Sequence, residues 1–194
     1  MKKVIVVIVG ESASGKSTVE KCLKTRFKHF SDVVSCTTRP IRDGESDGIS
    51  YNFVSEEEYE KLKNNNLFAE TGEYNGWKYG SLKSSYFKTE NDIIAVLTPH
   101  GMRQIKESMS KDYEVVSFYL KVPRRDRLIK CLKRGDDVEE AIRRNQSDVG
   151  QFDGVETEVD YVSRNNGYMY TPYQLADEIV DILKERFKWE KEKK

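Results

Sequence analysis

The sequence predicts an α/β fold with a mostly parallel central sheet flanked by helices. One observation is the unbroken valine and isoleucine run over residues 4–9, which is typical of a strand buried on both faces. A glycine-bounded loop follows this run directly, and apolar residues at helical spacing follow the loop. Further apolar strands, at 92–98 and 113–120, alternate with helical patterns, which favours parallel pairing through right-handed crossovers.

Length and charge limit the classes of function. The 194 residues suit one core with small inserted units. The 33 basic and 33 acidic residues cancel, so no global field attracts nucleic acid or an anionic membrane, and any anion site must be local. No apolar run approaches the roughly 20 residues that span a bilayer. The start at Met1 imitates a signal peptide, but its short apolar run leads straight into the loop, so we interpret it as a strand.

Cysteine and histidine give no sign of a metal site. Cys22, Cys36 and Cys131 are odd in number and widely spaced, and they form neither a zinc pattern nor a disulfide framework. We expect packed thiols in a reducing cytoplasm. His29 and His100 are isolated and predict neither a metal ligand nor a general base.

The loop after the first strand fits the phosphate-binding pattern G-x-x-x-x-G-K-[ST], and its position between strand and helix argues against a chance match. Backbone N–H groups and the helix N-terminus would converge on phosphate oxygens. Lys16 adds a positive charge near the β- and γ-phosphates, and the Ser17 hydroxyl can bind Mg²⁺. The expected phosphate-binding residues are Gly10, Glu11, Ser12, Ala13, Ser14, Gly15, Lys16, Ser17 and Thr18.

The next part of the chain predicts a small mixed α/β insertion. A short second strand is expected over 32–38, after which glycine, tyrosine, asparagine, serine and charge dominate as far as residue 90. Residues 49–54 alternate like a half-buried strand. Ser55 and Glu58 form a capping box that begins a helix. Turn signals within 68–81, at Asn75-Gly76 and Gly80, indicate short strands around turns.

The core resumes with the strand at 92–98, and Pro99 can begin the next helix. Pro123 begins another helix after the strand at 113–120. A polar stretch follows, with a helix over 139–145, and then a last strand over 159–162. The closing amphipathic helix is expected over 172–189, and one side of it carries Leu175, Ile179, Ile182, Leu183 and Phe187.

Parallel α/β sheets bind ligands at the carboxyl ends of their strands, where Gly10, residues 35–39 and Thr98 would meet. Arg39 and Arg42 can grip a phosphate through paired hydrogen bonds, although such a pair is more often a solvated surface. Glu70 can accept two N–H bonds from the edge of guanine, but by itself an exposed glutamate carries no such meaning.

A family resemblance helps to decide among these readings. Residues 37–45 read TTRPIRDGE, and Asp47-Gly48 and the YNFV of 51–54 follow. They resemble the T-T-R-x-x-R-x-G-E, (D/N)-G and Y-x-F-V segments of the guanylate kinase family. Glu70 and the NGWKYGS of 75–81 resemble that family's E…G-x-x-Y-G-(S/T). These segments follow the loop in the family's order, and the resemblance extends from about residue 3 to residue 183.

The resemblance implies a P-loop nucleoside monophosphate kinase fold. ATP with Mg²⁺ would phosphorylate GMP or dGMP, giving ADP and (d)GDP. Substrate-binding residues would be Ser35, Arg39, Arg42, Tyr51, Glu70, Tyr79, Ser81 and Thr98. The implied catalytic residues are Lys16, Arg39, Arg134 and Arg144, and the implied metal ligand is Ser17. The implied units are core 1–36, nucleotide-binding subdomain 37–90, core 91–133, lid 134–152 and core 153–194.

The chain departs from the family pattern in three places. Glu11 and Ala13 replace the proline and a glycine of the usual G-P-S-G-x-G-K-S loop. The strand ending at Thr98 lacks the family's two aspartates. Asn145 occupies the place of a second lid arginine, and we expect Arg144 to substitute from an angle rotated by about 100°.

Three alternatives stay open at this stage. One is a kinase with altered or broadened base preference, because a base site discriminates only when its polar partners are complete. A second is a kinase of another phosphorylated acceptor, such as a ribose phosphate, against which Glu70 speaks. A third is a non-catalytic interaction module, against which Lys16 and Ser17 speak. The sequence gives no prediction of the oligomeric state.

Overall fold

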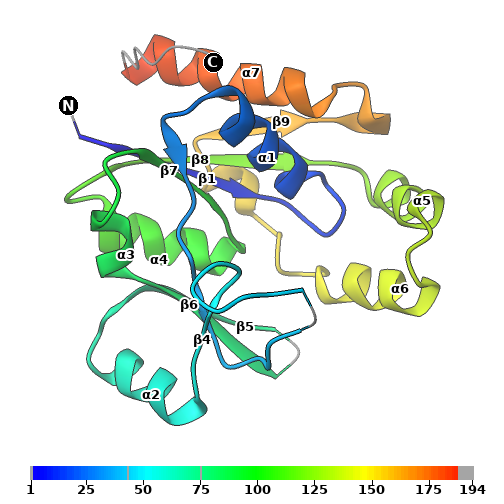
Figure 1. Cartoon of the computed structure of the whole chain (residues 1–194). Coiled ribbons are helices and arrows are strands. Elements are labelled where there is room, and N and C mark those ends of the chain that lie inside the picture. Colours follow the sequence, from blue (N-terminus) through cyan, green and yellow to red (C-terminus); the bar gives the residue numbers. More distant parts are fainter. Residues whose placement is uncertain (1, 43, 75, 188–194) are drawn as a thin grey trace.

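The computed structural model describes residues 2–42, 44–74 and 76–187, and it contains two sheets (Figure 1). The larger sheet has five strands, all paired in parallel, in the order β2-β7-β1-β8-β9. Its strands are β1 (Val4–Val9), β2 (Phe30–Ser31), β7 (Asp92–Val96), β8 (Glu114–Lys121) and β9 (Tyr161–Arg164). The predicted α/β class with a mostly parallel central sheet is therefore confirmed.

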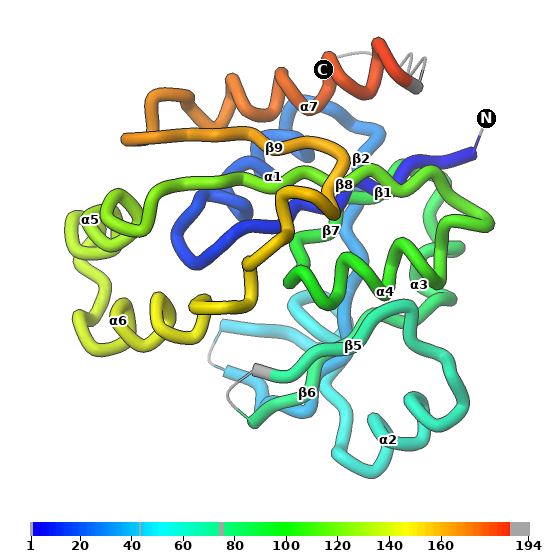
Figure 2. Tube along the Cα trace, turned by 180° about the vertical axis from the view of Figure 1, so that it is seen from behind, coloured from blue at the N-terminus to red at the C-terminus, as the bar shows by residue number. Residues whose placement is uncertain are grey.

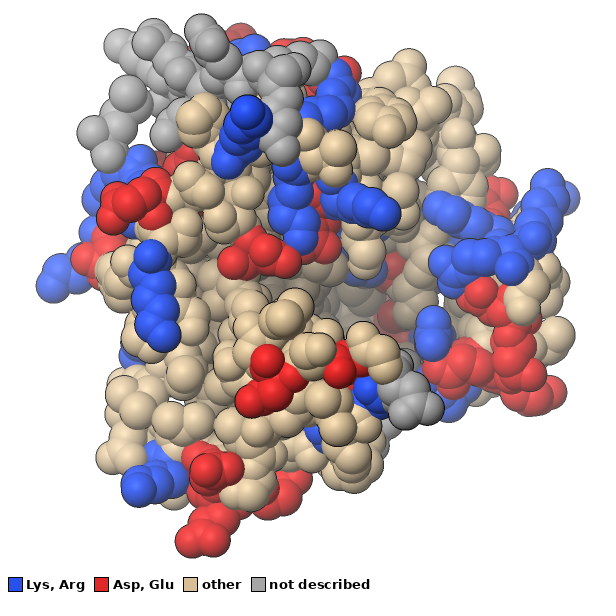
Figure 3. Space-filling view, viewed as in Figure 1, with Lys and Arg blue, Asp and Glu red and all other residues tan. Residues whose placement is uncertain are grey.

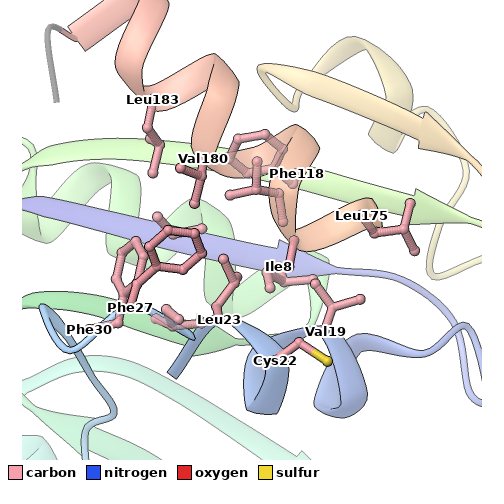
Figure 4. Packing of buried hydrophobic residues seen from close by; sticks show 14 of the residues in the cluster. Ile8, Val19, Cys22, Leu23, Phe27, Phe30, Phe118, Leu175, Val180 and Leu183 are labelled. Atoms are coloured by element: carbon pink, nitrogen blue, oxygen red, sulfur yellow. The ribbon is translucent and has the colours of Figure 1, made fainter. Parts of the chain in front are cut away.

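The central strand β1 is buried on both faces, as its unbroken apolar sequence predicts. Val6 and Ile8 point to the face covered by α1 (Lys16–Arg26) and α7 (Pro172–Phe187), where they meet Leu23 and Leu183 (Figure 4). Ile5 and the other odd-numbered residues of β1 pack on the opposite face, which is covered by α4 (Pro99–Met109). Two helical layers thus enclose the sheet.

The second sheet has four strands in the order β4-β3-β6-β5, with antiparallel and parallel pairs mixed. They are β3 (Cys36–Thr37), β4 (Asn52–Phe53), β5 (Phe68–Tyr74) and β6 (Trp77–Leu82). The helix α2 (Glu56–Asn64) packs here and begins with the predicted capping box. Ser55 Oγ accepts the N–H of Glu58, and the Glu58 carboxylate accepts the N–H of Ser55.

The strand expected over 32–38 forms only at residues 36–37, so its predicted extent is wrong. The chain forms β2 earlier, at the edge of the five-stranded sheet, and then β3 in the other sheet. Residues 32–35 form neither strand because the segment passes from one sheet to the other there, and a backbone that changes partners loses its ladder. Cys36 lies in β3, so this strand crosses the expected boundary between residues 36 and 37.

Other elements also differ in extent from the sequence expectation. The strand expected over 49–54 shrinks to β4, because residues 46–50 form a turn in which Ser50 N donates to Ser46 O. The helix α3 (Lys83–Phe87) was not predicted. In α7, Leu175, Ile179 and Leu183 are buried as expected, and Ile182 is partly buried. The Phe187 side chain, residues 188–189 and Asn75 lie outside the described residues.

Two further helices lie beyond the end of β8, to one side of the sheet (Figures 1 and 2). They are α5 (Arg124–Arg134), which follows Pro123, and α6 (Val138–Ser147). Single 3₁₀ turns, η1 (Val155–Thr157) and η2 (Asn166–Tyr168), flank β9. All three cysteines are buried and free. Within the described residues, no helix combines the length and apolar character needed to cross a bilayer.

Leu23 tests the packing of α1 and α7 on the sheet, because its side chain is fully buried. We expect Leu23→Ala to lower the free energy of unfolding by about 2–5 kcal/mol, as it leaves a cavity between layers. Leu132→Ala, at a leucine that is 53% exposed, should change it by less than about 0.5 kcal/mol. Urea unfolding measures both, and equal losses would contradict this core assignment.

Candidate active site

The loop between β1 and α1 has the geometry of a phosphate cradle. A Cβ at Gly10 would lie 2.6 Å from Ser14 Oγ and 2.8 Å from Leu120 O, so no larger residue fits there. Gly15 has φ of 105°, a left-handed conformation that favours glycine, and it immediately precedes α1. The N–H groups at the start of α1 have no helical acceptor of their own, which leaves them suited to an anion.

Lys16 bridges this loop. Its Nζ donates to Gly10 O at 2.6 Å and to Glu11 O at 2.9 Å. Burial lowers the pKa of Lys16 to about 8, although the carboxylates of Asp148 and Glu11 act in the opposite direction. Ser17 follows at the start of α1 with an exposed side chain. The ammonium group therefore lies against the loop that would carry the phosphates.

Arg39 lies buried at the end of β3, beside the predicted acceptor site. Its Nη2 donates to both oxygens of Glu45, at 2.7 and 3.0 Å. Its guanidinium also lies over the rings of Tyr51 and Phe53, 5.5 and 5.7 Å from their centroids. Glu45 accepts the backbone N–H of Arg42 as well, at 2.9 Å, and thereby fixes the turn between the two arginines. The sequence motif contained Glu45, but its orienting role was missed.

Glu70, in β5, is buried within a cluster of polar side chains. One carboxylate oxygen accepts the Ser81 hydroxyl at 2.6 Å, and the Ser35 and Ser81 hydroxyls lie 2.9 Å apart. Burial raises the pKa of Glu70. A Cβ at Gly101 would come within 3.4 Å of the other carboxylate oxygen, which places that oxygen at the start of α4. Three predicted residues, Ser35, Glu70 and Ser81, thus form one hydrogen-bonded cluster.

The remaining predicted substrate residues are Tyr51, Tyr79, Thr98 and Arg42. The Tyr51 and Tyr79 rings pack edge to face, 5.9 Å apart. Thr98 is the N-cap of α4, where its hydroxyl accepts the N–H of Gly101 at 3.1 Å. Thr98 thus contacts Gly101, the residue at which a Cβ would come within 3.4 Å of Glu70 Oε2. Arg42 is exposed, and the assignment of these residues to a substrate stays a prediction.

Each predicted lid arginine is held by a nearby carboxylate. Arg134 donates to Asp136, and Arg144 donates to Glu140 at 2.6 Å. Arg143 donates to the same Glu140, so both guanidinium groups of α6 share one partner. Asn145, at the position expected for an arginine, is only 1% exposed and faces Arg127. It points into the protein, which leaves Arg143 and Arg144 as the arginines of this turn.

Arg127 is a buried residue that sequence reasoning missed. Its guanidinium reaches Ser12 O and Asp148 Oδ2, both at 3.2 Å, and lies 3.6 Å from Glu11 Oε1. Asp148 in turn accepts the N–H of Ser12 at 2.8 Å. The only available signal was indirect: a negative charge at Glu11, inside a phosphate-binding loop, requires a cationic partner when it is buried.

Basic and acidic side chains segregate near this site. Figure 3 shows Lys and Arg gathered over α5 and Asp and Glu below them over α6, beside a recess in the surface. The recess separates these helices from the four-stranded sheet. The P-loop, Thr98 and α5 follow the carboxyl ends of β1, β7 and β8, and because these strands are parallel, the fold places all three at the same edge of the central sheet.

The lowered pKa of Lys16 gives a testable pH dependence of ATP affinity. Below pH 8 the amine is protonated in the free protein and attracts phosphate, whereas above pH 8 it is neutral. We therefore expect the Kd for ATP to rise above pH 8, by up to about ten-fold per pH unit. Calorimetric titration from pH 7 to pH 9.5 measures this, and Lys16→Arg should remove the effect. An unchanged slope in that variant would assign the titration to another group.

Comparisons with known proteins agree with this geometry. The family model for guanylate kinase matches residues 2–181. The guanylate kinase of Prochlorococcus marinus is 32% identical over 186 residues, which cover 94% of this chain and 97% of that protein. The guanylate kinase of Nitratidesulfovibrio vulgaris is 35% identical over 145 residues, 73% of this chain and 69% of that protein.

A solved structure supports the fold. The guanylate kinase from Anaplasma phagocytophilum aligns with a TM-score of 0.66 at 24% identity, and the alignment covers 97% of each chain. At that identity the likeness concerns the fold alone. The family model covers nearly the whole chain, and the relatives carry more than 30% identity along most of their length. The chain therefore belongs to the guanylate kinase family.

Proposed function

We propose that this protein transfers the γ-phosphoryl group of ATP to GMP or dGMP, giving ADP and GDP or dGDP. The observation that carries the proposal is a buried carboxylate, Glu70, which accepts a serine hydroxyl in the same molecule that holds an intact P-loop. A P-loop alone indicates a bound nucleoside triphosphate. The buried Glu70 supports a second nucleotide site, whose occupant can accept the phosphoryl group.

Hydrogen-bond complementarity accounts for the choice of guanine. The Ser81 hydroxyl occupies one oxygen of Glu70, and further lone pairs remain on the carboxylate. Guanine presents two donors, N1–H and N2–H₂, which would satisfy them. Adenine presents an N1 acceptor in the same place, which would leave the buried charge unpaired and facing a lone pair. Glu70 therefore favours guanine, because binding of adenine would leave its buried carboxylate without the two donors that guanine supplies.

Charge around the transferred phosphoryl group accounts for catalysis. Phosphoryl transfer requires in-line positioning and electrostatic stabilisation rather than covalent help. In this proposal Lys16 and the loop N–H groups bind the donor phosphates, and Arg39, Arg42, Tyr51 and Tyr79 bind the acceptor phosphate. Arg39 is already oriented by Glu45, which lowers the cost of ordering it when the nucleotide binds.

The lid completes the charge distribution. Arg134 and either Arg144 or Arg143 would approach the phosphates from α5 and α6. We infer that residues 37–90 and 134–152 move as units around the core, and that their closure excludes water, so that GMP rather than water receives the phosphoryl group.

In this proposal Mg²⁺ binds together with ATP, and the protein alone does not hold it. Among the described residues, no group of three His, Cys, Asp or Glu side chains could hold a metal ion by itself. The exposed hydroxyl of Ser17, at the start of α1, could supply one oxygen ligand. Phosphate oxygens and water would supply the others, as is usual for this ion. When bound, the metal neutralises negative charge on the phosphates.

We further infer a cytoplasmic setting from the three buried free thiols. Partners would be small nucleotides rather than nucleic acid, since basic and acidic residues balance. The intact loop geometry and the contacts of Lys16 speak against a purely non-catalytic interaction module.

A coupled ADP-release assay with ATP, Mg²⁺ and a panel of ribo- and deoxyribonucleoside monophosphates tests the proposal. Turnover of GMP and dGMP is expected, and Lys16→Ala should lower it by at least about 100-fold. Turnover of none of the acceptors would contradict the enzyme assignment. Preference for AMP or dTMP would contradict the base assignment and favour an altered base preference.

Glu70→Gln tests the guanine reader with almost no change of size. We expect kcat/KM for GMP to fall by about 100-fold, the value of one to two charged hydrogen bonds, while kcat/KM for AMP changes little. Glu73→Gln, at an exposed glutamate of the same strand β5, is the matched control and should leave both values unchanged. If the preference for GMP over AMP survives in Glu70→Gln, Glu70 does not read the base.

A further inference from the structure

Three consecutive P-loop residues, 11–13, are each contacted by a side chain from outside the loop. Arg127 of α5 reaches Glu11, Asp148 after α6 reaches Ser12, and a third residue reaches Ala13. Two of the loop residues, Glu11 and Ala13, stand where the family pattern has proline and glycine. The contacts thus coincide with the positions at which this loop lacks the rigid proline and the permissive glycine of the family pattern.

Ala13 has a backbone conformation that alanine rarely adopts. Its φ is 64°, in the left-handed region that glycine enters without penalty and that is unfavourable for residues with a Cβ. The Ala13 carbonyl accepts the hydroxyl of Tyr168 at 2.7 Å. This hydrogen bond joins two positions 155 residues apart and fixes the peptide group that follows the strained residue.

Tyr168 is itself held in place. The ammonium group of Lys130 lies over its ring, 4.0 Å from the centroid. The preceding residue, Gly167, donates its N–H to Asp126 at 2.8 Å. Both Lys130 and Asp126 belong to α5, so the turn that carries Tyr168 is fastened to the helix that also carries Arg127. A hydroxyl positioned in this way can restrain the loop.

The contacts at Glu11 and Ser12 form one buried network. Arg127 is 4% exposed, and Val122 O, Ser12 O, Asn145 Oδ1 and Asp148 Oδ2 all accept from it. Asp148 accepts both the N–H and the hydroxyl of Ser12, at 2.8 and 3.3 Å. The network links the loop to the residue that follows the last turn of α6.

We propose that Tyr168, Arg127 and Asp148 are positioning residues, which hold residues 11–13 in the conformation that presents the loop N–H groups to the phosphates of ATP. They act through the loop and not by touching the reacting atoms. The proposal rests on the proposed function only in naming ATP as the bound nucleotide. It assigns to long-range contacts the restraint that proline would give locally at position 11, and the stabilisation of a left-handed conformation that glycine would adopt without strain at position 13.

A double-mutant cycle between Tyr168→Phe and Ala13→Gly tests this coupling. The readout is the Kd of ATP by calorimetry without any acceptor, with the thermal midpoint of each variant measured alongside. Tyr168→Phe should raise the Kd by about 5- to 10-fold, the equivalent of one hydrogen bond. In the Ala13→Gly background it should raise the Kd less than about two-fold, because glycine adopts the left-handed conformation without strain.

Tyr170→Phe is the matched control, since Tyr170 is an exposed tyrosine of the same loop, 48% exposed, and it should leave the Kd unchanged. The proposal is overturned if Tyr168→Phe leaves the Kd unchanged, or raises it equally in both backgrounds. Because ATP binding is measured without GMP, failure of phosphoryl transfer to GMP would not be confused with failure of this cycle.

Asp148→Asn tests the second contact independently of Tyr168. It should raise the Kd of ATP several-fold, measured by calorimetry without acceptor, while the Kd of GMP measured alone changes less than about two-fold, because the charge-assisted bond to Ser12 is weakened. Asp153→Asn, at an exposed residue nearby, is its control. A purely structural role would lower the thermal midpoint and weaken both nucleotides alike, and that result would contradict the assignment of Asp148.

Discussion

The P-loop conformation is the constraint on which the rest of the structure depends. Within six residues the chain must leave the most buried strand, β1, turn through a cradle of N–H groups and begin α1. Gly10 permits this because only hydrogen fits between Ser14 and β8. Because β1 is the central strand of its sheet, the loop that follows it lies between the helices α5 and α6 and the second sheet (Figure 1).

Four arginines that would meet phosphate in the proposed reaction are paired with carboxylates. Arg39 forms an ion pair with Glu45, Arg134 forms one with Asp136, and both arginines of α6 pair with Glu140. These pairs hold guanidinium groups in defined positions and reduce their mutual repulsion before a nucleotide binds. The buried Glu70 differs from these cations, because its printed hydrogen-bond partner is the hydroxyl of Ser81 rather than a charged group. In the proposed function, binding of the phosphates and recognition of the base therefore depend on different residues.

Local signals in the sequence predicted the elements whose causes are local. The β1 run, the glycine-bounded loop, the Ser55 cap and the helix starting at Pro99 all depend on neighbouring residues, and all occur as expected. The split of residues 30–37 between two sheets was not predicted, because it depends on which distant strands are available as partners. The contacts of Arg127 and Tyr168 with the loop span more than 100 residues and leave no periodic pattern to detect.

The central claim is that one molecule holds an adenine nucleotide and a guanine nucleotide with their phosphates facing each other. The direct measurement is calorimetric binding of adenosine and guanosine joined 5′ to 5′ through five phosphates, compared with the bis-adenosine compound of equal length. We expect one mixed molecule per protein, bound at least about 100-fold more tightly than the bis-adenosine compound. Equal affinities for the two compounds, or two molecules bound per protein, would contradict the account.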